Sequence, residues 1–265
     1  LMFKNSIEKG LDLTQCAELF TVGVDGAGLA VVADSFAALQ QRIEQEKRIS
    51  WEDIYKYLHN DFEGVDGERV RAMMSSSQRY CQGNTLGDMW AKRITELFTR
   101  LVKAQKMPEG RQLIPGWFSW SNTIHFGSTV GATPNGRKKG TPISHGANPN
   151  PGFRKDGAAT AMSTGIAQVQ PGYGNTAPLQ LEFDPGITKE EGGVEKVLNL
   201  IKTHFALGGT LININILDEE KLMAAHKNPD LYPDLVVRVT GFTAYFAALS
   251  PEFRQLVVDR FVKGI

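Results

Sequence analysis

The chain has 265 residues, and its 29 Lys and Arg residues balance 29 Asp and Glu residues, so the formal net charge is +0. Hydrophobic residues make up 42% and charged residues 22%, which is typical of a globular protein with a buried core. The balanced charge argues against nucleic acid as a partner. The longest apolar runs are much shorter than the roughly 20 residues that cross a bilayer, which argues against a membrane protein.

Cysteine usage and the first residue restrict the class further. Cys16 and Cys81 lie far apart and belong to no Cys-x-x-Cys pair, which argues against a structural zinc site or a disulfide framework. A reducing cytoplasm is the simplest compartment for such a chain. The first residue is Leu1 rather than methionine, from which we expect a fragment or a trimmed chain.

Residues 1 to about 105 have the apolar spacing of helices. We predict helices over 33–48, 51–62 and 87–106. Ser50 stands directly before the second of them and is a predicted N-cap, because its hydroxyl can accept a hydrogen bond from an unpaired N–H of the first turn. The first half of the chain is therefore predicted to be mainly helical.

Residues 107 to 193 are rich in turn signals but also hold many aromatic and aliphatic residues, so we predict packed loops and short strands rather than a linker. One turn, TPNGRKKG at 133–140, has three basic residues. A phosphate cradle is possible there, but the Gly-x4-Gly-Lys-Ser/Thr spacing is absent, and a solvated hairpin or a docking surface is the alternative. Four of the five histidines are scattered without metal-ligand spacing, so we expect no bound metal. These four are His125, His145, His204 and His226.

From Gly193 the pattern becomes regular and predicts an α/β arrangement. A helix ends at Gly208 and Gly209, and an alternating strand follows over 210–217. A helix broken at Pro229, a strand or loop over 235–242 and a terminal helix complete the pattern. Ser250 is the predicted N-cap of that last helix.

Gly241 stands in the stretch RVTGFTAYF, which otherwise reads as buried. Glycine in such a run costs backbone entropy and packs nothing. A tight turn or a close approach of two backbones would explain it, and so would a chemistry that needs a Cα with two hydrogens. Composition and spacing leave these explanations open.

The stretch RVTGFTAYFAALSPEFRQLVVDR resembles the C-terminal radical loop of the glycyl radical enzymes, the pyruvate formate-lyase-like superfamily. The matching positions of the loop are Arg238, Val239, Thr240, Gly241, Phe242 and Phe246. The preceding segment, with its His-x-Asn-Pro and Tyr-Pro-Asp-Leu pieces, and the Thr-Pro-Asn-Gly-Arg loop at 133–137 are similar to the family as well. The resemblance covers most of the chain and is strong over about 130–265.

The resemblance implies a radical stored on Gly241, with Arg238, Val239, Thr240, Phe242 and Phe246 supporting the loop. A separate activase with S-adenosylmethionine and a 4Fe–4S cluster would remove one Gly241 hydrogen. A planar Cα would then share the unpaired electron with the neighbouring amides, and the apolar flank would exclude water and oxygen. The radical would pass to a cysteine, and the thiyl would attack a small-molecule substrate.

The family's catalytic cysteine lies several hundred residues before the glycine, so we expect it outside this chain. Cys16, in a Cys-x-Glu string, and Cys81 are weaker candidates, for which a buried structural thiol is the better reading. Trp117 and Phe118 fall near the family's aromatic pocket residues and are predicted to line the substrate pocket. Relatives are commonly homodimers, which is the expected assembly here.

The resemblance implies an α/β fold that forms the C-terminal part of a ten-stranded barrel with surrounding helices. We predict a helical portion over 1–129 and a glycine radical domain over 130–265. The expected reaction is anaerobic cleavage of a C–C or C–heteroatom bond in a small organic acid. The sequence looks closer to the arylacetate decarboxylase and isethionate sulfite-lyase branches than to pyruvate formate-lyase. A formate-lyase-type acyltransferase, a stand-alone radical subunit and a non-catalytic binding module remain alternatives.

Overall fold

A computed structural model of the chain describes residues 5–17, 21–107, 111–151, 159–170 and 176–262. The helices are α1 (Ser6–Lys9), α2 (Leu13–Cys16), α3 (Leu29–Leu39), α4 (Trp51–His59), α5 (Gly64–Ser75), α6 (Leu86–Lys103), α7 (Thr123–Ser128), α8 (Ala159–Gln168), α9 (Gly193–Ala206), α10 (Glu219–Lys227) and α11 (Pro251–Val262). The strands are β1 (Thr21–Asp25), β2 (Gln112–Gly116), β3 (Leu179–Phe183), β4 (Ile212–Ile216), β5 (Val236–Arg238) and β6 (Thr243–Tyr245).

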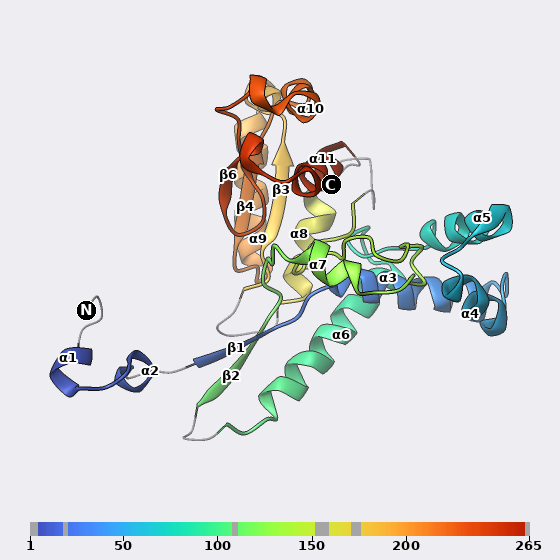
Figure 1. The fold of residues 1–265 in the computed structure, drawn as a ribbon, viewed down its shortest axis with the longest axis horizontal. Helices are drawn as coiled ribbons and strands as arrows, with labels where there is room; N and C mark the ends of the chain where they lie inside the picture. Colours follow the sequence, from blue (N-terminus) through green and yellow to red (C-terminus); the bar gives the residue numbers. More distant parts are fainter. Residues whose placement is uncertain (1–4, 18–20, 108–110, 152–158, 171–175, 263–265) are drawn as a thin grey trace.

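Two groups of elements meet at the centre of the molecule (Figure 1). Strands β3 and β4 stand beside α8 and α9, with α10 at their far end. Strands β1 and β2 run alongside α6, and α4 and α5 lie on the other side of the molecule. The short α7 and the loops around it lie where the groups meet, close to α11 and α3 in this view. The glycine-rich middle of the chain is therefore the junction of the fold.

The described strands form three two-stranded sheets, so they do not close the predicted ten-stranded barrel. Strands β1 and β2 pair in parallel, and so do β3 and β4. Each parallel pair is joined through helices, as parallel strands require. Strands β5 and β6 form an antiparallel hairpin. The α/β class is confirmed, whereas closing a barrel would need strands on the free edges of these pairs.

The first half is mainly helical, as the sequence pattern predicts, but it differs from the prediction in several places. The predicted helix over 33–48 begins earlier, at Leu29, and its second part is a π-helical turn over Gln40–Gln45. Ser50 caps α4 by accepting a hydrogen bond from the Asp53 N–H at 3.0 Å. Helix α5 was not predicted, because its glycines hid the pattern. Gly67 is needed there, since a Cβ would lie 2.3 Å from the Phe62 carbonyl oxygen.

The second half confirms the predicted order of elements. Helix α9 ends before Gly208, which adopts a left-handed φ of 97°. Strand β4 follows, and the chain after α10 returns as the β5–β6 hairpin. Ser250 accepts a long hydrogen bond of 3.4 Å from the Phe253 N–H at the start of α11. These local signals fix the frame that carries Gly241.

The hydrophobic core consists of separate clusters. The largest joins α3 and α6 to β3 and α8, through residues such as Leu29, Tyr80 and Leu179. A second cluster is built from α10, α11 and the β5–β6 hairpin. Its buried members are Leu217, Leu222, Ala225, Leu235, Val237, Val239, Phe246, Val257 and Val258. The hairpin that carries Gly241 therefore packs in the second cluster and not in the largest one.

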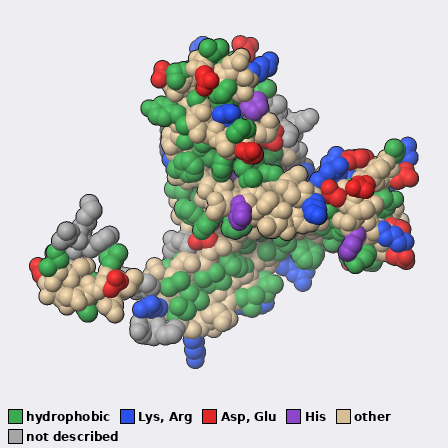
Figure 2. Space-filling view, in the orientation of Figure 1, with side chains coloured by type: hydrophobic (Ala, Val, Ile, Leu, Met, Phe, Trp, Pro, Cys, Tyr) green, Lys and Arg blue, Asp and Glu red, His purple; other side chains and the backbone are tan. Residues whose placement is uncertain are grey.

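Several large apolar side chains are exposed, and Figure 2 shows hydrophobic surface over the part that carries β2 and α6 and over the upper part of the molecule. Leu97 and Leu101 of α6 are among them, and so are Phe242 and Tyr245 beside Gly241.

A helix that crosses a bilayer needs about 20 apolar residues. No helix among the described residues is long and apolar enough to do so.

Candidate functional site

Gly241 lies at the tip of the β5–β6 hairpin. The register pairs Val237 with Ala244 and Arg238 with Thr243. Beyond the last pair, the Val239 N–H donates to the Phe242 carbonyl at 3.0 Å, which closes the turn. We call residues 239–242 the glycine loop. Thr240 and Gly241 are its two tip residues.

Gly241 stands in a tight turn, but among the described residues neither the backbone conformation of that turn nor a close approach requires a glycine there. Its φ lies outside the left-handed region that favours glycine. A Cβ built on Gly241 would have its nearest neighbours at 3.8 Å, the Phe118 Cζ, and at 3.9 Å, the Ser119 carbonyl oxygen, which are ordinary contacts. An alanine would fit without strain. The geometry therefore supplies no steric or conformational reason for a glycine at this position.

The flank of the glycine loop is buried on one side and exposed on the other. Val239 and Thr240 are buried, and Phe246 is fully buried. Gly241 itself is exposed, and Phe242 is 44% exposed. Alternate residues of the hairpin point away from its core, which is why Phe242 is exposed among the described residues. Shielding of Gly241 by the apolar flank stays a prediction.

The side chain of Arg238 holds the hairpin together. Its Nη1 donates to Thr243 Oγ1 at 3.1 Å, and its Nη2 donates to Asn213 Oδ1 at 3.3 Å. Both acceptors are oxygens of uncharged side chains, a hydroxyl and an amide. Thr243 pairs with Arg238 across the ladder, so the contact follows from the register of the hairpin.

The backbone of Arg238 is held by side chains of the neighbouring strands. Asn215 of β4 accepts from the Arg238 N–H at 2.8 Å and donates to the Arg238 carbonyl at 3.0 Å. Its amide thus takes the place of a strand partner for β5. Gln180 of β3 donates to the same carbonyl at 3.3 Å. These contacts fix the point at which the chain enters the glycine loop.

Arg260 of α11 is a buried cation next to the glycine loop. Its Nη2 donates to the Arg238 carbonyl at 2.8 Å, and its Nη1 donates to the Val239 carbonyl. Its Nε lies 3.2 Å from Oε1 of Glu182, and both side chains are almost fully buried. Burial raises the pKa of the Glu182 carboxyl and lowers the pKa of Arg260, while their attraction opposes both shifts.

Sequence reasoning missed this ion pair. The signal was present: Arg260 interrupts an apolar run in the terminal helix, and Glu182 stands between Leu181 and Phe183 in a strand. A charge at a position that should be buried needs a partner. However, 78 residues separate the two (260 minus 182), and no local pattern links them.

The structure separates the two aromatic residues predicted to line the substrate pocket. Trp117 is buried, and its Nε1 donates to Thr95 Oγ1 at 3.0 Å. Its ring centroid lies 4.8 Å from that of Phe98 with the two rings tilted by 36°, and the ring fills the space that a Gly26 Cβ would occupy. Trp117 is thus a core residue, which corrects its predicted place. Phe118 is 43% exposed and faces Gly241, so a substrate role remains a prediction for Phe118.

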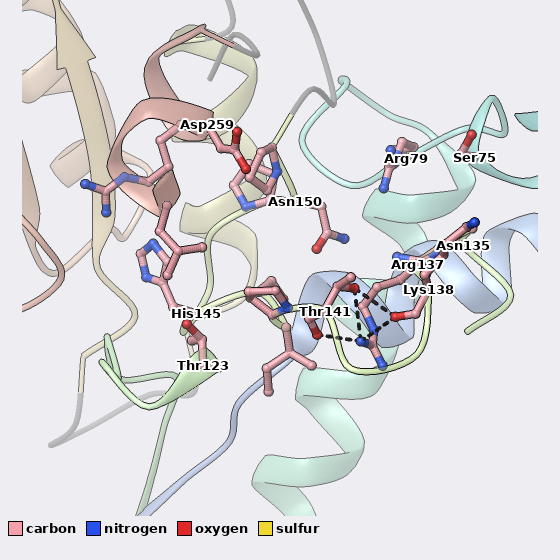
Figure 3. Close-up of a pocket in the computed structure, with 18 of the residues that line it drawn as sticks. Ser75, Arg79, Thr123, Asn135, Arg137, Lys138, Thr141, His145, Asn150 and Asp259 are labelled. Carbon is pink, nitrogen blue, oxygen red and sulfur yellow. Dashed lines mark hydrogen bonds between the residues drawn. The ribbon is translucent and has the colours of Figure 1, made fainter. Parts of the chain in front are cut away.

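A cavity of about 560 Å³ borders the glycine loop. Val239, Thr240 and Arg260 are among the residues that line it. Further lining residues come from α5, from the 133–151 segment and from the rest of α11. His145, Asn150 and Arg79 are labelled among the lining side chains in Figure 3. Neither Gly241 nor Phe118 lines this cavity, so it is distinct from the face on which the two meet.

The basic residues of the cavity are engaged with protein groups. Arg137 donates to four carbonyl oxygens, including those of Val130 and Gly131. Lys138 pairs with Glu68, and Arg79 lies 3.1 Å from Asp34. The 133–140 turn therefore supports the loop, and these contacts argue against the phosphate cradle.

His145 lines the cavity and has a strongly shifted pKa. Burial, followed by the positive charge of Arg260, lowers the pKa of His145 from 6.5 to about 3. Its Nδ1 is buried without a hydrogen-bond partner among the described residues. The imidazole is therefore neutral in the folded state at any pH near neutrality.

We expect this histidine to make the folded chain less stable in acid. The unfolded chain binds a proton below about pH 6.5, whereas the folded chain excludes it until about pH 3, so stability is lost as pH falls through this window. Between pH 7 and 4.5 the loss should be on the order of 2 kcal/mol. Urea unfolding at both pH values, with His145→Gln as the control, measures it. Equal pH dependence of the two proteins would contradict the assignment.

Both cysteines are buried free thiols. Burial and the nearby Asp88 raise the pKa of Cys81 well above its usual value, and the Cys16 thiol donates weakly to the Leu11 carbonyl at 3.6 Å. These environments fit structural thiols. Across the ranges described, no group of three or more His, Cys, Asp or Glu side chains is placed to hold a metal ion.

Two family models match the chain. One described as "Pyruvate formate lyase-like" matches residues 1–127, and one described as "Glycine radical" matches residues 143–247, a range that includes Gly241. The second of these matched ranges holds β3, β4 and the β5–β6 hairpin that carries Gly241. The chain belongs to the glycyl radical enzymes of the pyruvate formate-lyase-like superfamily and corresponds to their C-terminal portion.

Curated relatives cover most of this chain. An isethionate sulfite-lyase of Oleidesulfovibrio alaskensis is 28% identical over 235 residues, which are 88% of this chain and 28% of the relative. A trans-4-hydroxy-L-proline dehydratase of Clostridioides difficile is 26% identical over 255 residues, 96% of this chain and 32% of the relative. The chain thus spans about a third of the length of the curated relatives it matches.

Solved structures agree in fold. The B12-independent glycerol dehydratase of Clostridium butyricum superimposes with a TM-score of 0.84 at 30% identity, over 98% of this chain and 33% of that one. The hydroxyproline dehydratase of Clostridioides difficile gives a TM-score of 0.86 at 28% identity, over 97% and 32%. The arrangement in Figure 1 is therefore that of about a third of a glycyl radical enzyme.

Proposed function

We propose that Gly241 stores the radical of a glycyl radical enzyme. The observation that carries this proposal is the absence of a structural need for glycine at this position. An ordinary φ and neighbours no closer than 3.8 Å would accept an alanine. A radical centre, by contrast, needs a Cα that can become planar between two amides. The match of residues 143–247 to the glycine radical family supports the same position.

The proposed chemistry begins with loss of one Gly241 hydrogen to an activase that uses S-adenosylmethionine and an iron–sulfur cluster. A cysteine thiol outside this chain then gives its hydrogen atom to the Gly241 Cα, which leaves a thiyl. The thiyl takes a hydrogen atom from the substrate, whose C–C or C–heteroatom bond then breaks. Phe118, which contacts the Gly241 position, is the proposed aromatic wall beside this path.

We propose a substrate class from the names of the relatives. Their names include a sulfite-lyase and dehydratases, in which a carbon–heteroatom bond is broken. We infer carbon–heteroatom cleavage of a small polar substrate as the reaction class. We also propose that residues 130–265 act as the radical domain, that residues 1–129 belong to the surrounding enzyme, and that the enzyme is a homodimer. The matched ranges 1–127 and 143–247 support that division.

Anaerobic electron paramagnetic resonance tests the proposal. The full-length gene product is incubated with its activase, S-adenosylmethionine and a reductant. We expect an organic radical whose spectrum is a doublet from the one remaining α-hydrogen, and protein made with α-deuterated glycine should give a collapsed line. Air should then break the backbone at Gly241 and separate the segment that begins at Phe242, which mass spectrometry detects. Absence of this radical in the full-length protein would contradict the assignment of Gly241 as the radical site.

A further inference from the structure

The position of Gly241 is not set by close packing around it. Val239 and Thr240 border the cavity of about 560 Å³. The nearest atoms to a Gly241 Cβ are 3.8 Å and 3.9 Å away. Gly241 is exposed, whereas Thr240 beside it is buried. Among the described residues, the Gly241 Cα is therefore held by some interaction other than packing at Gly241.

Hydrogen bonds to two successive carbonyls supply that interaction. The Arg238 carbonyl accepts hydrogen bonds from the side chains of Gln180, Asn215 and Arg260. The Val239 carbonyl accepts a hydrogen bond from Arg260. Arg260 is the residue that joins both carbonyls, and it reaches the one nearer to Gly241. Its planar guanidinium can direct two donors at once, which an ammonium group cannot do with the same geometry.

Glu182 fixes the direction of that guanidinium. Its Oε1 lies 3.2 Å from the Arg260 Nε, and both side chains are about 5% exposed, at 4% and 6%. Gln180 donates to the same carboxylate oxygen at 3.3 Å. The buried carboxylate therefore attracts the Nε side of Arg260 as an ion pair, while both Nη atoms donate to the loop carbonyls.

We propose that Arg260 is a positioning residue for the radical site and that Glu182 orients it. This inference rests on the proposed role of Gly241. Arg260 does not touch reacting atoms; it holds the loop so that the Gly241 Cα meets the thiol that must give it a hydrogen atom. Without Arg260, a radical can still form on Gly241, but its transfer becomes slow because the reacting atoms are misplaced.

The test compares variants in the full-length enzyme after activation by its activase. Arg260→Met removes both carbonyl contacts. Arg254→Met is the matched control, because Arg254 lies on the same helix and also donates to backbone carbonyls, those of Leu249 at 2.8 Å and Ala247 at 3.4 Å. The readouts are spins per chain, kcat per spin, and KM. Circular dichroism and thermal unfolding report on the fold.

For Arg260→Met we expect kcat per spin to fall about 100-fold while KM changes less than about threefold, since misplacement by about 1 Å has that effect on rate. Arg254→Met should keep kcat per spin within about threefold of wild type. Glu182→Gln retains the carbonyl contacts and should fall between the two. Unchanged kcat per spin in Arg260→Met, or an equal loss in Arg254→Met, would overturn the inference.

Arg260→Lys decides the matter if the methionine variant does not fold. Lysine keeps the charge for Glu182 but reaches one carbonyl, and we expect about a tenfold lower kcat per spin with an unchanged KM. A lysine variant with wild-type kcat per spin would overturn the inference. Absence of a radical in the wild-type enzyme would instead refute the proposed function, so the two failures are distinguishable.

Discussion

Replacing Gly241 with alanine should leave a folded chain that carries no radical. The added methyl group meets nothing closer than 3.8 Å, and the backbone is not left-handed, so the free energy of unfolding should change by less than about 1 kcal/mol. The methyl group would, however, hinder the planar Cα on which the radical depends. We expect the activase-dependent radical signal and turnover to fall to the detection limit.

Paired measurements make this result interpretable. Thermal unfolding of Gly241→Ala should overlay that of wild type, while the magnetic resonance doublet disappears. Gly131→Ala is the matched control, because a Cβ at Gly131 meets nothing within 4 Å and its φ is also ordinary. That variant should keep the signal and the activity. A persistent doublet in Gly241→Ala would place the radical elsewhere.

Gly127→Ala should strongly destabilise the junction of the fold. A Cβ at Gly127 would lie 2.2 Å from the Thr141 carbonyl oxygen and 2.7 Å from the Pro142 Cα. Both are backbone atoms, which cannot rotate away as a side chain would. Overpacking of this kind costs about 1–3 kcal/mol, and we expect about 3 kcal/mol here because backbone must move. Helix α7 would separate from the 141–143 stretch.

Urea denaturation of Gly127→Ala and Gly131→Ala measures this loss of stability. Gly127→Ala should lower the midpoint, whereas Gly131→Ala, four residues later in the same segment, should not. Because the 141–145 stretch lines the cavity beside Thr240, the first variant should also reduce activity. Equal stability of the two variants would contradict the close approach of α7 to Thr141.

The sequence predicts those features of the site whose residues are neighbours along the chain. Gly241 and its hairpin follow from one motif, and Ser50 and Gly208 follow from capping rules that act within a few residues. The pairing of Glu182 with Arg260 could not be predicted in this way, because it depends on how α11 packs against β3. The environment of Phe242 depends equally on which face of the hairpin meets the core.

The incorrect details have physical causes as well. Trp117 looked like a pocket residue because it stands in a glycine- and aromatic-rich segment, but Thr95 and Phe98 on α6 offered it a hydrogen bond and a ring contact. Helix α5 was missed because glycine has a poor helix propensity, although Gly67 is there to let the backbone of Phe62 approach. In both cases tertiary contacts prevailed over local preference.

The second core cluster has a consequence for how the chain opens. Its members all come from residues 217–258, one continuous stretch, whereas the largest cluster joins residues as distant as Leu29 and Leu200. Contacts that are local in sequence form without the closure of long loops, and such stretches commonly behave as separate cooperative units. Amide hydrogen exchange in α10 and α11 should therefore report an opening free energy that differs from the one measured in α3 and α6. The tip of the hairpin belongs to that unit, and it would move with it while α3 and α6 stay protected.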